Sequence, residues 1–227
     1  MWRERLSNAV RVADVGELDR TFVSMVRSMR PSIVTDVGSR DAAMAITCKQ
    51  ASPKSKVFAF EANPENYFEF AELAVGNGVH FVPCAVGERS DTRQIKVPNW
   101  ASTRSKADRQ RRGVGSLLHR DGVACEVVYQ APMVSLADFF QLPEHEDATF
   151  AHWIDVEGCS YEVLQGLGRD LAMRTMFLKL EVETRRVWEG QKLVADCLEL
   201  CDQLGFEPCS WFDHDLQFDI VFANRDL

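Results

Sequence analysis

The feature that most constrains this chain is a regular alternation of short apolar strands with helical segments. The clearest unit starts with the apolar run at residues 33–37, passes through a glycine turn into a helix from about residue 42, and returns to an apolar run at residues 56–61. Further strands are expected at residues 79–82, 93–97, 125–130, 150–155, 176–182, 206–211 and 218–222. The alternation predicts an α/β fold, with a mostly parallel sheet covered by helices on both faces. Sheets of this kind bind ligands at the carboxyl ends of their strands.

The chain divides into a short leading segment and one domain. Its 227 residues suffice for one sizeable α/β domain. Residues 1–30 carry apolar side chains at helical spacing and predict a helical extension, which Pro31 closes, so residues 31–227 are expected to form a single domain. Residues 99–122 are rich in arginine and glycine, which predicts a long, mobile basic loop inserted in that domain. Such a loop is well placed to close over a site and to capture an anionic acceptor.

Composition excludes several classes of protein. The net charge of −8 argues against nucleic acid as the main partner. The N-terminus has no apolar run of signal-peptide length and no other stretch is long enough to span a bilayer, so we expect a cytoplasmic protein. The seven cysteines are scattered and none forms a CxxC pair; even Cys197 and Cys201, four apart on an expected helix, are read as reduced core residues, and no metal centre is expected.

Two strand ends predict a nucleoside-containing cofactor. The first strand ends in Asp36-Val37-Gly38, where a glycine lets the backbone pass close to a ligand and the following helix offers free N–H groups. The GxGxxG pattern of dinucleotide sites is absent from this turn. The second strand ends in Glu61, 25 residues after Asp36, where a carboxylate can accept hydrogen bonds from both ribose hydroxyls.

Further carboxylates follow two later strands. Asp155 and Glu157 end the strand at residues 150–155, and they could hold an ammonium group, a metal or a substrate hydroxyl. In the next strand Lys179, Glu181 and Glu183 alternate onto one face. Lys179 is expected to pair with a neighbouring acid, either as a structural ion pair or as part of the chemistry.

These segments together resemble the FkbM family of methyltransferases. The resemblance rests on Asp36-Val37-Gly38, Phe60-Glu61-Ala62-Asn63-Pro64, Val134-Ser135-Leu136-Ala137-Asp138, Ile154-Asp155-Val156-Glu157-Gly158 and Val163-Leu164-Gln165-Gly166, and it runs from about residue 31 to 223. It implies the class I methyltransferase fold, a Rossmann-like sheet with one antiparallel strand near the C-terminus. It also implies S-adenosylmethionine as cofactor, S-adenosylhomocysteine as product, and O-methylation of a hydroxyl on a sugar, glycan or other natural product.

The resemblance assigns cofactor roles residue by residue. Against the methionine part it implies the turn Asp36, Gly38, Ser39, Arg40 and Asp41; on the ribose, Glu61 with Ala62 and Asn63; near the adenine, Cys84, Ala85 and Val86. Asp155 is implied near the methionine amino group or the reacting hydroxyl. The chain departs from the family in Ser39-Arg40-Asp41-Ala42, where Ala-Asn-x-Gly is common, and in Trp153, where lysine is common.

Methyl transfer to an alcohol needs positioning and a general base. The candidate catalytic residues are Asp155, Glu157 and, in the basic loop, His119, whereas His152 lies within a strand and is expected in the core. Two other functions stay open for the same sequence: a non-catalytic protein that binds S-adenosylmethionine, and a nicotinamide-dependent oxidoreductase. A small-molecule or glycan acceptor is the expected partner, and a homo-oligomer is compatible with the sequence.

Overall fold

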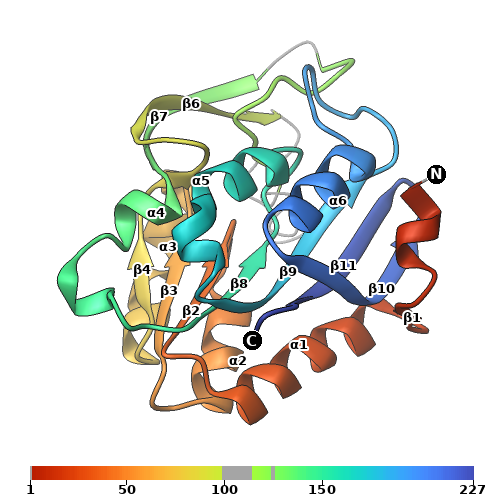
Figure 1. The fold of residues 1–227 in the computed structure, drawn as a ribbon. Helices are drawn as coiled ribbons and strands as arrows, with labels where there is room; N and C mark the ends of the chain where they lie inside the picture. The colour runs from red at the N-terminus through yellow and green to blue at the C-terminus, as the bar shows by residue number, and fades with distance from the viewer. Residues whose placement is uncertain (1, 99–113, 124–125) are drawn as a thin grey trace.

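The computed structural model describes residues 2–98, 114–123 and 126–227. Its centre is an eight-stranded sheet (Figure 1). In spatial order the strands are β1 (Val10–Arg11), β10 (Phe206–His214), β11 (Gln217–Asn224), β9 (Thr175–Glu183), β8 (Phe150–Ile154), β2 (Ile33–Val37), β3 (Lys56–Phe60) and β4 (His80–Val82). β11 runs antiparallel to both of its neighbours, and all other pairs are parallel. The expected mostly parallel sheet with one antiparallel strand near the C-terminus is confirmed.

Helices cover both faces of the sheet. One face carries α1 (Val15–Met29), α2 (Ala43–Ala51) and α3 (Pro64–Gly76), and the other carries α4 (Leu136–Phe139), α5 (Ser160–Ala172) and α6 (Val194–Gln203). Local sequence starts several of them: Asp14, Asn63 and Ser135 each accept a hydrogen bond from a backbone N–H of the first turn. The side chains of Phe22, Trp153 and Phe177 form edge-to-face pairs in the core beneath α1.

A second, smaller sheet stands beside the first (Figure 1). It consists of β5 (Ala85–Val86), β7 (Glu126–Val134) and β6 (Asp91–Pro98), with β6 and β7 antiparallel. The predicted strands at 93–97 and 125–130 therefore pair with each other and not with the main sheet. Of the basic loop between them, residues 99–113 lie outside the described residues. Residues 114–123 are described, and Ser116 is joined to Lys96 of β6 by two backbone hydrogen bonds.

The N-terminal segment differs from the expected helical extension. A 3-10 helix η1 (Trp2–Leu6) comes first, then the short strand β1, and helix begins only at Val15. β1 pairs with the edge of β10, and Arg11 reinforces that pairing by binding Asp213 at 2.8 Å through Nε. Helical spacing alone did not reveal this, because the partner strand lies some 200 residues away in sequence and its edge is supplied only by the folded sheet.

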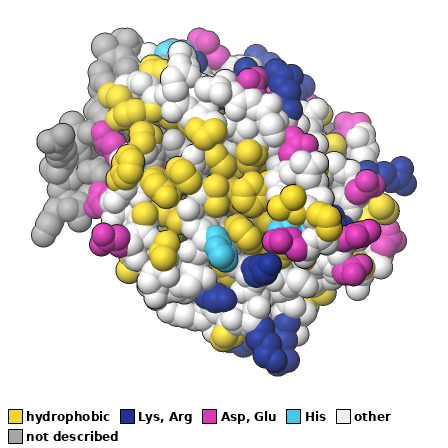
Figure 2. Space-filling view, turned by 90° about the vertical axis from the view of Figure 1, so that its left-hand side faces the viewer, with side chains coloured by type: hydrophobic (Ala, Val, Ile, Leu, Met, Phe, Trp, Pro, Cys, Tyr) yellow, Lys and Arg dark blue, Asp and Glu magenta, His cyan; other side chains and the backbone are white. Residues whose placement is uncertain are grey.

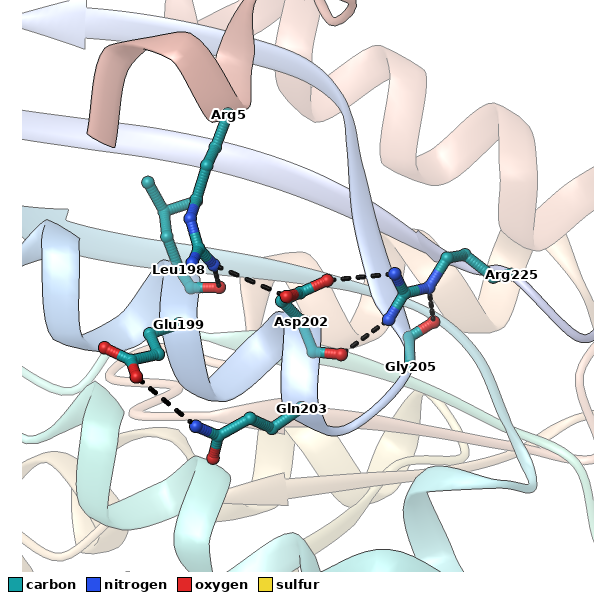
Figure 3. Close-up of polar contacts among 7 residues, drawn as sticks. All are labelled: Arg5, Leu198, Glu199, Asp202, Gln203, Gly205 and Arg225. Atoms are coloured by element: carbon teal, nitrogen blue, oxygen red, sulfur yellow. Dashed lines mark hydrogen bonds and ion pairs between the residues drawn. The ribbon is translucent and has the colours of Figure 1, made fainter. Parts of the chain in front are cut away.

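Both ends of the chain are tied to the last turns of α6 (Figure 3). Arg5 from η1 donates to the Leu198 carbonyl at 3.2 Å, and its guanidinium lies 3.7 Å from the Asp202 carboxylate. Arg225 binds the other oxygen of Asp202 at 2.9 Å and also donates to the Gly205 carbonyl. The C-terminus of a helix carries a partial negative charge, so the two arginine side chains beside it stabilise the end of α6.

Within the described part of the chain, no helix is long and apolar enough to cross a membrane. Figure 2 shows apolar side chains gathered on one face of the molecule. Separately, α3 leaves Phe68 and Val75 largely exposed.

Candidate active site

Two adjoining hollows open at the carboxyl ends of the main-sheet strands, where the alternation of strands and helices predicts a ligand. Gly38, Asp155 and Glu157 line both of them. The first hollow is otherwise lined by Phe60, Glu61, Ala62, Cys84, Ala85, Val86, Ile95, Gly115, Ser116, Leu117, Val156 and Cys159. The second is otherwise lined by Asp36, Ser39, Arg40, Asp41, Ala43, Met44, Val114, Trp153, Glu181 and Gln217. Together they form one path across the Gly38 turn.

The Gly38 turn is fixed by its neighbours. Gly38 has a φ of +82°, and a Cβ there would lie 1.9 Å from the Asp155 carbonyl oxygen, so only glycine fits. The N–H groups of Gly38 and Ser39 both donate to the Phe60 carbonyl. Arg40 has a φ of +48° and binds Asp41 at 2.7 Å through Nη2. Glycine is therefore required at position 38 because the backbone at Asp155 lies so close. The Arg40 guanidinium is already bound by a carboxylate.

Asp36 supports this turn from below. Its Oδ2 accepts hydrogen bonds from Ser39 Oγ at 2.6 Å and from the Ala45 N–H at 3.0 Å. Burial raises the pKa of Asp36 to about 6, although these hydrogen bonds lower it. Asp36 borders the second hollow, but its contacts are with the turn and with the first residues of α2. We therefore expect it to act on a ligand by shaping the turn.

Glu61 is a buried carboxylate at the end of β3. Oε2 accepts from the Arg40 N–H and Oε1 from the Asn63 N–H, each at 2.7 Å. Burial raises its pKa to about 7, against the lowering effect of those hydrogen bonds. Ala62 lines the first hollow, whereas Asn63 lines neither hollow, because its side chain caps α3 by accepting from the Glu65 N–H.

The far wall of the first hollow is largely apolar. Cys84, Ala85 and Val86 line it as the sequence predicts, and burial raises the pKa of the Cys84 thiol to about 12, so the thiol stays neutral. Ile95 of β6 and the segment Gly115–Leu117 complete the wall. Sequence reasoning missed these residues, because nothing in a basic, glycine-rich stretch indicates which of its members return to the sheet edge.

Ser116 joins that segment to the motif turn. Its hydroxyl donates to the Glu157 carbonyl at 2.7 Å and accepts from the Leu118 N–H at 3.1 Å. Glu157 itself has a φ of +39°, a conformation that costs energy for a residue with a Cβ. The hydrogen bond from Ser116 therefore helps to hold Glu157 in its unusual backbone geometry.

The carboxyl groups that follow β8 lie close to those of β9. Burial raises the pKa of Glu157 to about 8, with Asp155 and Glu183 adding to the effect. Burial and Asp155 likewise raise the pKa of Glu181, whose side chain accepts from Gln217 at 2.9 Å. Such groups resist ionisation at neutral pH, which is typical of side chains poised to exchange a proton or to meet a cation.

The two histidines considered as bases lie elsewhere. His119 lines neither hollow, and its carbonyl accepts from the Glu189 N–H at 2.8 Å. His152 is fully buried between the hydroxyls of Thr35 and Thr175, at 2.7 and 3.0 Å, and burial lowers its pKa to about 3. His152 is therefore the core residue that the sequence predicts.

Lys179 is buried under the site and pairs with acids, as expected. Its ammonium lies 2.5 Å from Asp219 and 3.4 Å from Asp155, and 4.4 Å from the centre of the Trp153 ring. Trp153 packs beneath the second hollow. Asp219 was missed by sequence reasoning, because it lies on a strand that joins the sheet antiparallel. Across residues 2–98, 114–123 and 126–227, no group of three His, Cys, Asp or Glu side chains is arranged to hold a metal ion.

Comparison with known proteins gives one family match. A model of the methyltransferase FkbM domain matches residues 32–208. A search of curated proteins finds none that matches the chain.

Solved structures with a similar fold are distant in sequence. Precorrin-6y C5,15-methyltransferase from Geobacter metallireducens is 14% identical, with 92% of this chain and 88% of that chain covered and a TM-score of 0.49. An O-methyltransferase family protein from Burkholderia thailandensis is 8% identical, with 92% and 55% covered and a TM-score of 0.46.

Proposed function

The chain belongs to the FkbM methyltransferase family and depends on S-adenosylmethionine, and from that premise we propose that it methylates a hydroxyl oxygen of a small-molecule or glycan acceptor. The observation that carries the proposal is the path formed by the two hollows across Gly38. It has a buried carboxylate and an apolar wall at one end, and several carboxylates at the other. The order of these lining residues along the path suits a ligand with a nucleoside at one end and an amino acid at the other.

The residues of the first hollow fit an adenosine. The Glu61 carboxylate is buried, and its two short bonds from backbone N–H groups fix it in place. An ionised carboxylate has about four acceptor positions, and Oε1 also accepts from the Asn66 amide at 3.4 Å, so one position, on Oε2, is left for a ribose hydroxyl. The apolar wall from Cys84 to Val86 and Leu117 suits the adenine. The turn from Gly38 to Asp41 and the Asp155 carboxylate would hold the methionine part.

In this proposal Glu157 is the general base. S-adenosylmethionine, when bound, supplies a methyl group that is activated by its positively charged sulfur. Glu157 lines both hollows, and its ionised form can accept the proton that the acceptor hydroxyl loses. Since its pKa is raised to about 8, transfer should rise with pH through that region and level off above it. His119 receives less support as a base, because it lines neither hollow.

The charge of the second hollow bears on the acceptor. Asp41, Asp155, Glu157 and Glu181 line it, with Arg40 bound to Asp41. A neutral, hydroxylated acceptor therefore suits the described wall better than an anionic one. The arginines on which capture of an anionic acceptor would depend, Arg109, Arg111 and Arg112, lie outside the described residues.

The test is methyl transfer from isotopically labelled S-adenosylmethionine to a panel of neutral sugars, amino sugars, nucleotide-sugars and polyketide alcohols. Glu157→Gln should lower the transfer rate by about 10²–10⁴-fold while S-adenosylhomocysteine binds nearly as before. Glu207→Gln, an exposed change on β10, is the matched control and should leave the rate unchanged. Full activity in Glu157→Gln would remove Glu157 from the chemistry.

Two other functions give different results in the same experiments. A non-catalytic protein would bind S-adenosylmethionine and methylate no member of the panel. A nicotinamide-dependent oxidoreductase would bind NAD, whereas we expect this protein not to bind it. Calorimetric titration with both cofactors separates these outcomes from the proposed one.

A further inference from the structure

Lys179 is a buried cation that the proposed chemistry does not yet use. It lies in the middle of β9 with 1% of its surface exposed. Taking an ammonium group out of water costs several kcal/mol unless other charges compensate. Burial lowers the pKa of Lys179, but Asp155 and Asp219 outweigh that effect and raise it above its usual range. The side chain is therefore a positive charge held inside the sheet by two carboxylates.

Strand register places this charge directly behind the site. Lys179 is paired with Trp153 of β8 on one side and with Val221 of β11 on the other. Asp219 approaches it from β11 at 2.5 Å, and Asp155 from the end of β8 at 3.4 Å. Asp155 lines both hollows and Lys179 lines neither. Any influence of Lys179 on a ligand must therefore pass through another residue. Asp155 and the Trp153 ring both contact Lys179 and line the second hollow, and of these two Asp155 carries the charge.

Asp155 needs a cation beside it. Its charge acts on five other carboxyl groups, those of Asp19, Asp36, Glu157, Glu181 and Glu183, and raises the pKa of each. The Asp155 side chain keeps about a third of its surface exposed, whereas Lys179 is almost completely enclosed. Without Lys179, Asp155 would lose the ion pair that joins its Oδ2 to the interior of the sheet, and its carboxylate would be free to turn.

We propose that Lys179 is a positioning residue for the cofactor: by binding Oδ2 of Asp155 from inside the sheet, it keeps Oδ1 directed at the ammonium group of the methionine part. The inference rests on the proposed function, in which Asp155 contacts that ammonium. It explains why a lysine is buried at this place: Asp219 and the Trp153 ring hold its ammonium from within, and Asp155 extends its influence to the ligand path.

The test compares two ligands that differ in the amino-acid part. S-adenosylhomocysteine carries the ammonium group, and methylthioadenosine lacks the whole amino-acid portion. In Lys179→Met, the affinity for S-adenosylhomocysteine should fall roughly 10–100-fold, the effect of losing a hydrogen bond to a charged group. The affinity for methylthioadenosine should stay within about twofold, because a lost local contact leaves the adenosine end unchanged.

A double variant shows whether Lys179 acts through Asp155. If it does, Lys179→Met combined with Asp155→Asn should bind S-adenosylhomocysteine no more weakly than Asp155→Asn alone. Asp219→Asn is the comparison variant, since it removes the other buried partner and leaves the pair of Lys179 with Asp155. It should lower the melting temperature and weaken S-adenosylhomocysteine binding less than Lys179→Met does. If Lys179→Met alone does not fold, Lys179→Met with Asp219→Asn removes one charge of each sign and is titrated in its place.

The outcomes separate this inference from the function on which it rests. Equal losses for both ligands in the Lys179 variant, or additive losses in the double variant, would mean a purely structural lysine and would overturn the inference alone. A wild-type protein that binds neither ligand would overturn the proposed function, and the inference with it.

Discussion

The protonation of Glu61 should control binding of the adenosine end. Burial raises its pKa to about 7, and only the ionised carboxylate has an acceptor position left for a ribose hydroxyl once the donors of Arg40, Asn63 and Asn66 are counted. Below pH 7 the Glu61 carboxylate binds a proton, so the fraction of protein molecules that can bind the ribose falls with decreasing pH. At one pH unit below the pKa about one tenth of the molecules are ionised, so affinity at pH 6 should be roughly tenfold weaker than on the plateau above pH 8.

Methylthioadenosine is the ligand of choice for this measurement. It lacks the amino-acid part and so reports less on Glu157 and Glu183, whose pKa values burial also raises. Calorimetric titration from pH 5.5 to 8.5 should give an affinity that rises about fivefold between pH 6 and pH 7, about twofold more above pH 7, and then levels off. Glu61→Gln should bind methylthioadenosine weakly at every pH, because the NH2 of the glutamine side chain then faces a backbone N–H donor.

The matched control is Glu72→Gln, an exposed change on α3, which should keep the wild-type profile. A wild-type affinity that changes less than about threefold between pH 8 and pH 6 would refute the reasoning, since the ionised fraction must change more than that. The same slope in Glu61→Gln would assign the titration to another group.

Two further predictions concern the scaffold of the site. Gly38→Ala should abolish binding of S-adenosylhomocysteine and lower the free energy of unfolding by more than the roughly 1–2 kcal/mol of left-handed strain, because its Cβ would lie 1.9 Å from the Asp155 carbonyl. Gly76→Ala, whose Cβ meets nothing within 4 Å, is the control for denaturation and titration. Equal behaviour of the two variants would contradict the geometry. His152 has its pKa lowered to about 3, so the folded state binds fewer protons than the unfolded state and stability falls as pH drops from 6.5 toward 3. His152→Asn should remove about 1.4 kcal/mol per pH unit of that decline, measured by urea denaturation at pH 6.5 and 5, and an unchanged decline would show that His152 is not its source.

Much of the fold could be predicted from local sequence. The apolar runs at 33–37, 56–60 and 150–154 are strands of the central sheet, and Asn63 and Ser135 start helices as their hydrogen-bonding capacity allows. Strand ends meet at one edge of a parallel sheet, so Gly38 and Asp155, 117 residues apart, could be assigned to one site before any contact was known.

Contacts made between distant segments could not be predicted in this way. β1 becomes a strand only because β10 offers a free edge, and β6 and β7 form their own sheet because they pair with each other. Ser116 reaches the Glu157 carbonyl across 41 residues, which no local pattern encodes. Asn63 matches the family motif, yet the structure commits its side chain to capping α3.

The Gly38 turn shows the same division within one motif. Sequence alone determined that a turn with a required glycine follows the first strand, since backbone preferences and strand alternation are local properties. Tertiary structure decided why the glycine is required, because the Asp155 carbonyl occupies the place of a Cβ. It also decided the state of the charges around the turn. Burial sets the pKa of Glu61 and Glu157, and neighbouring strands bring Asp219 and Asp155 to Lys179. Desolvation and charge proximity depend on what surrounds a group in space, which a sequence specifies only through the complete fold.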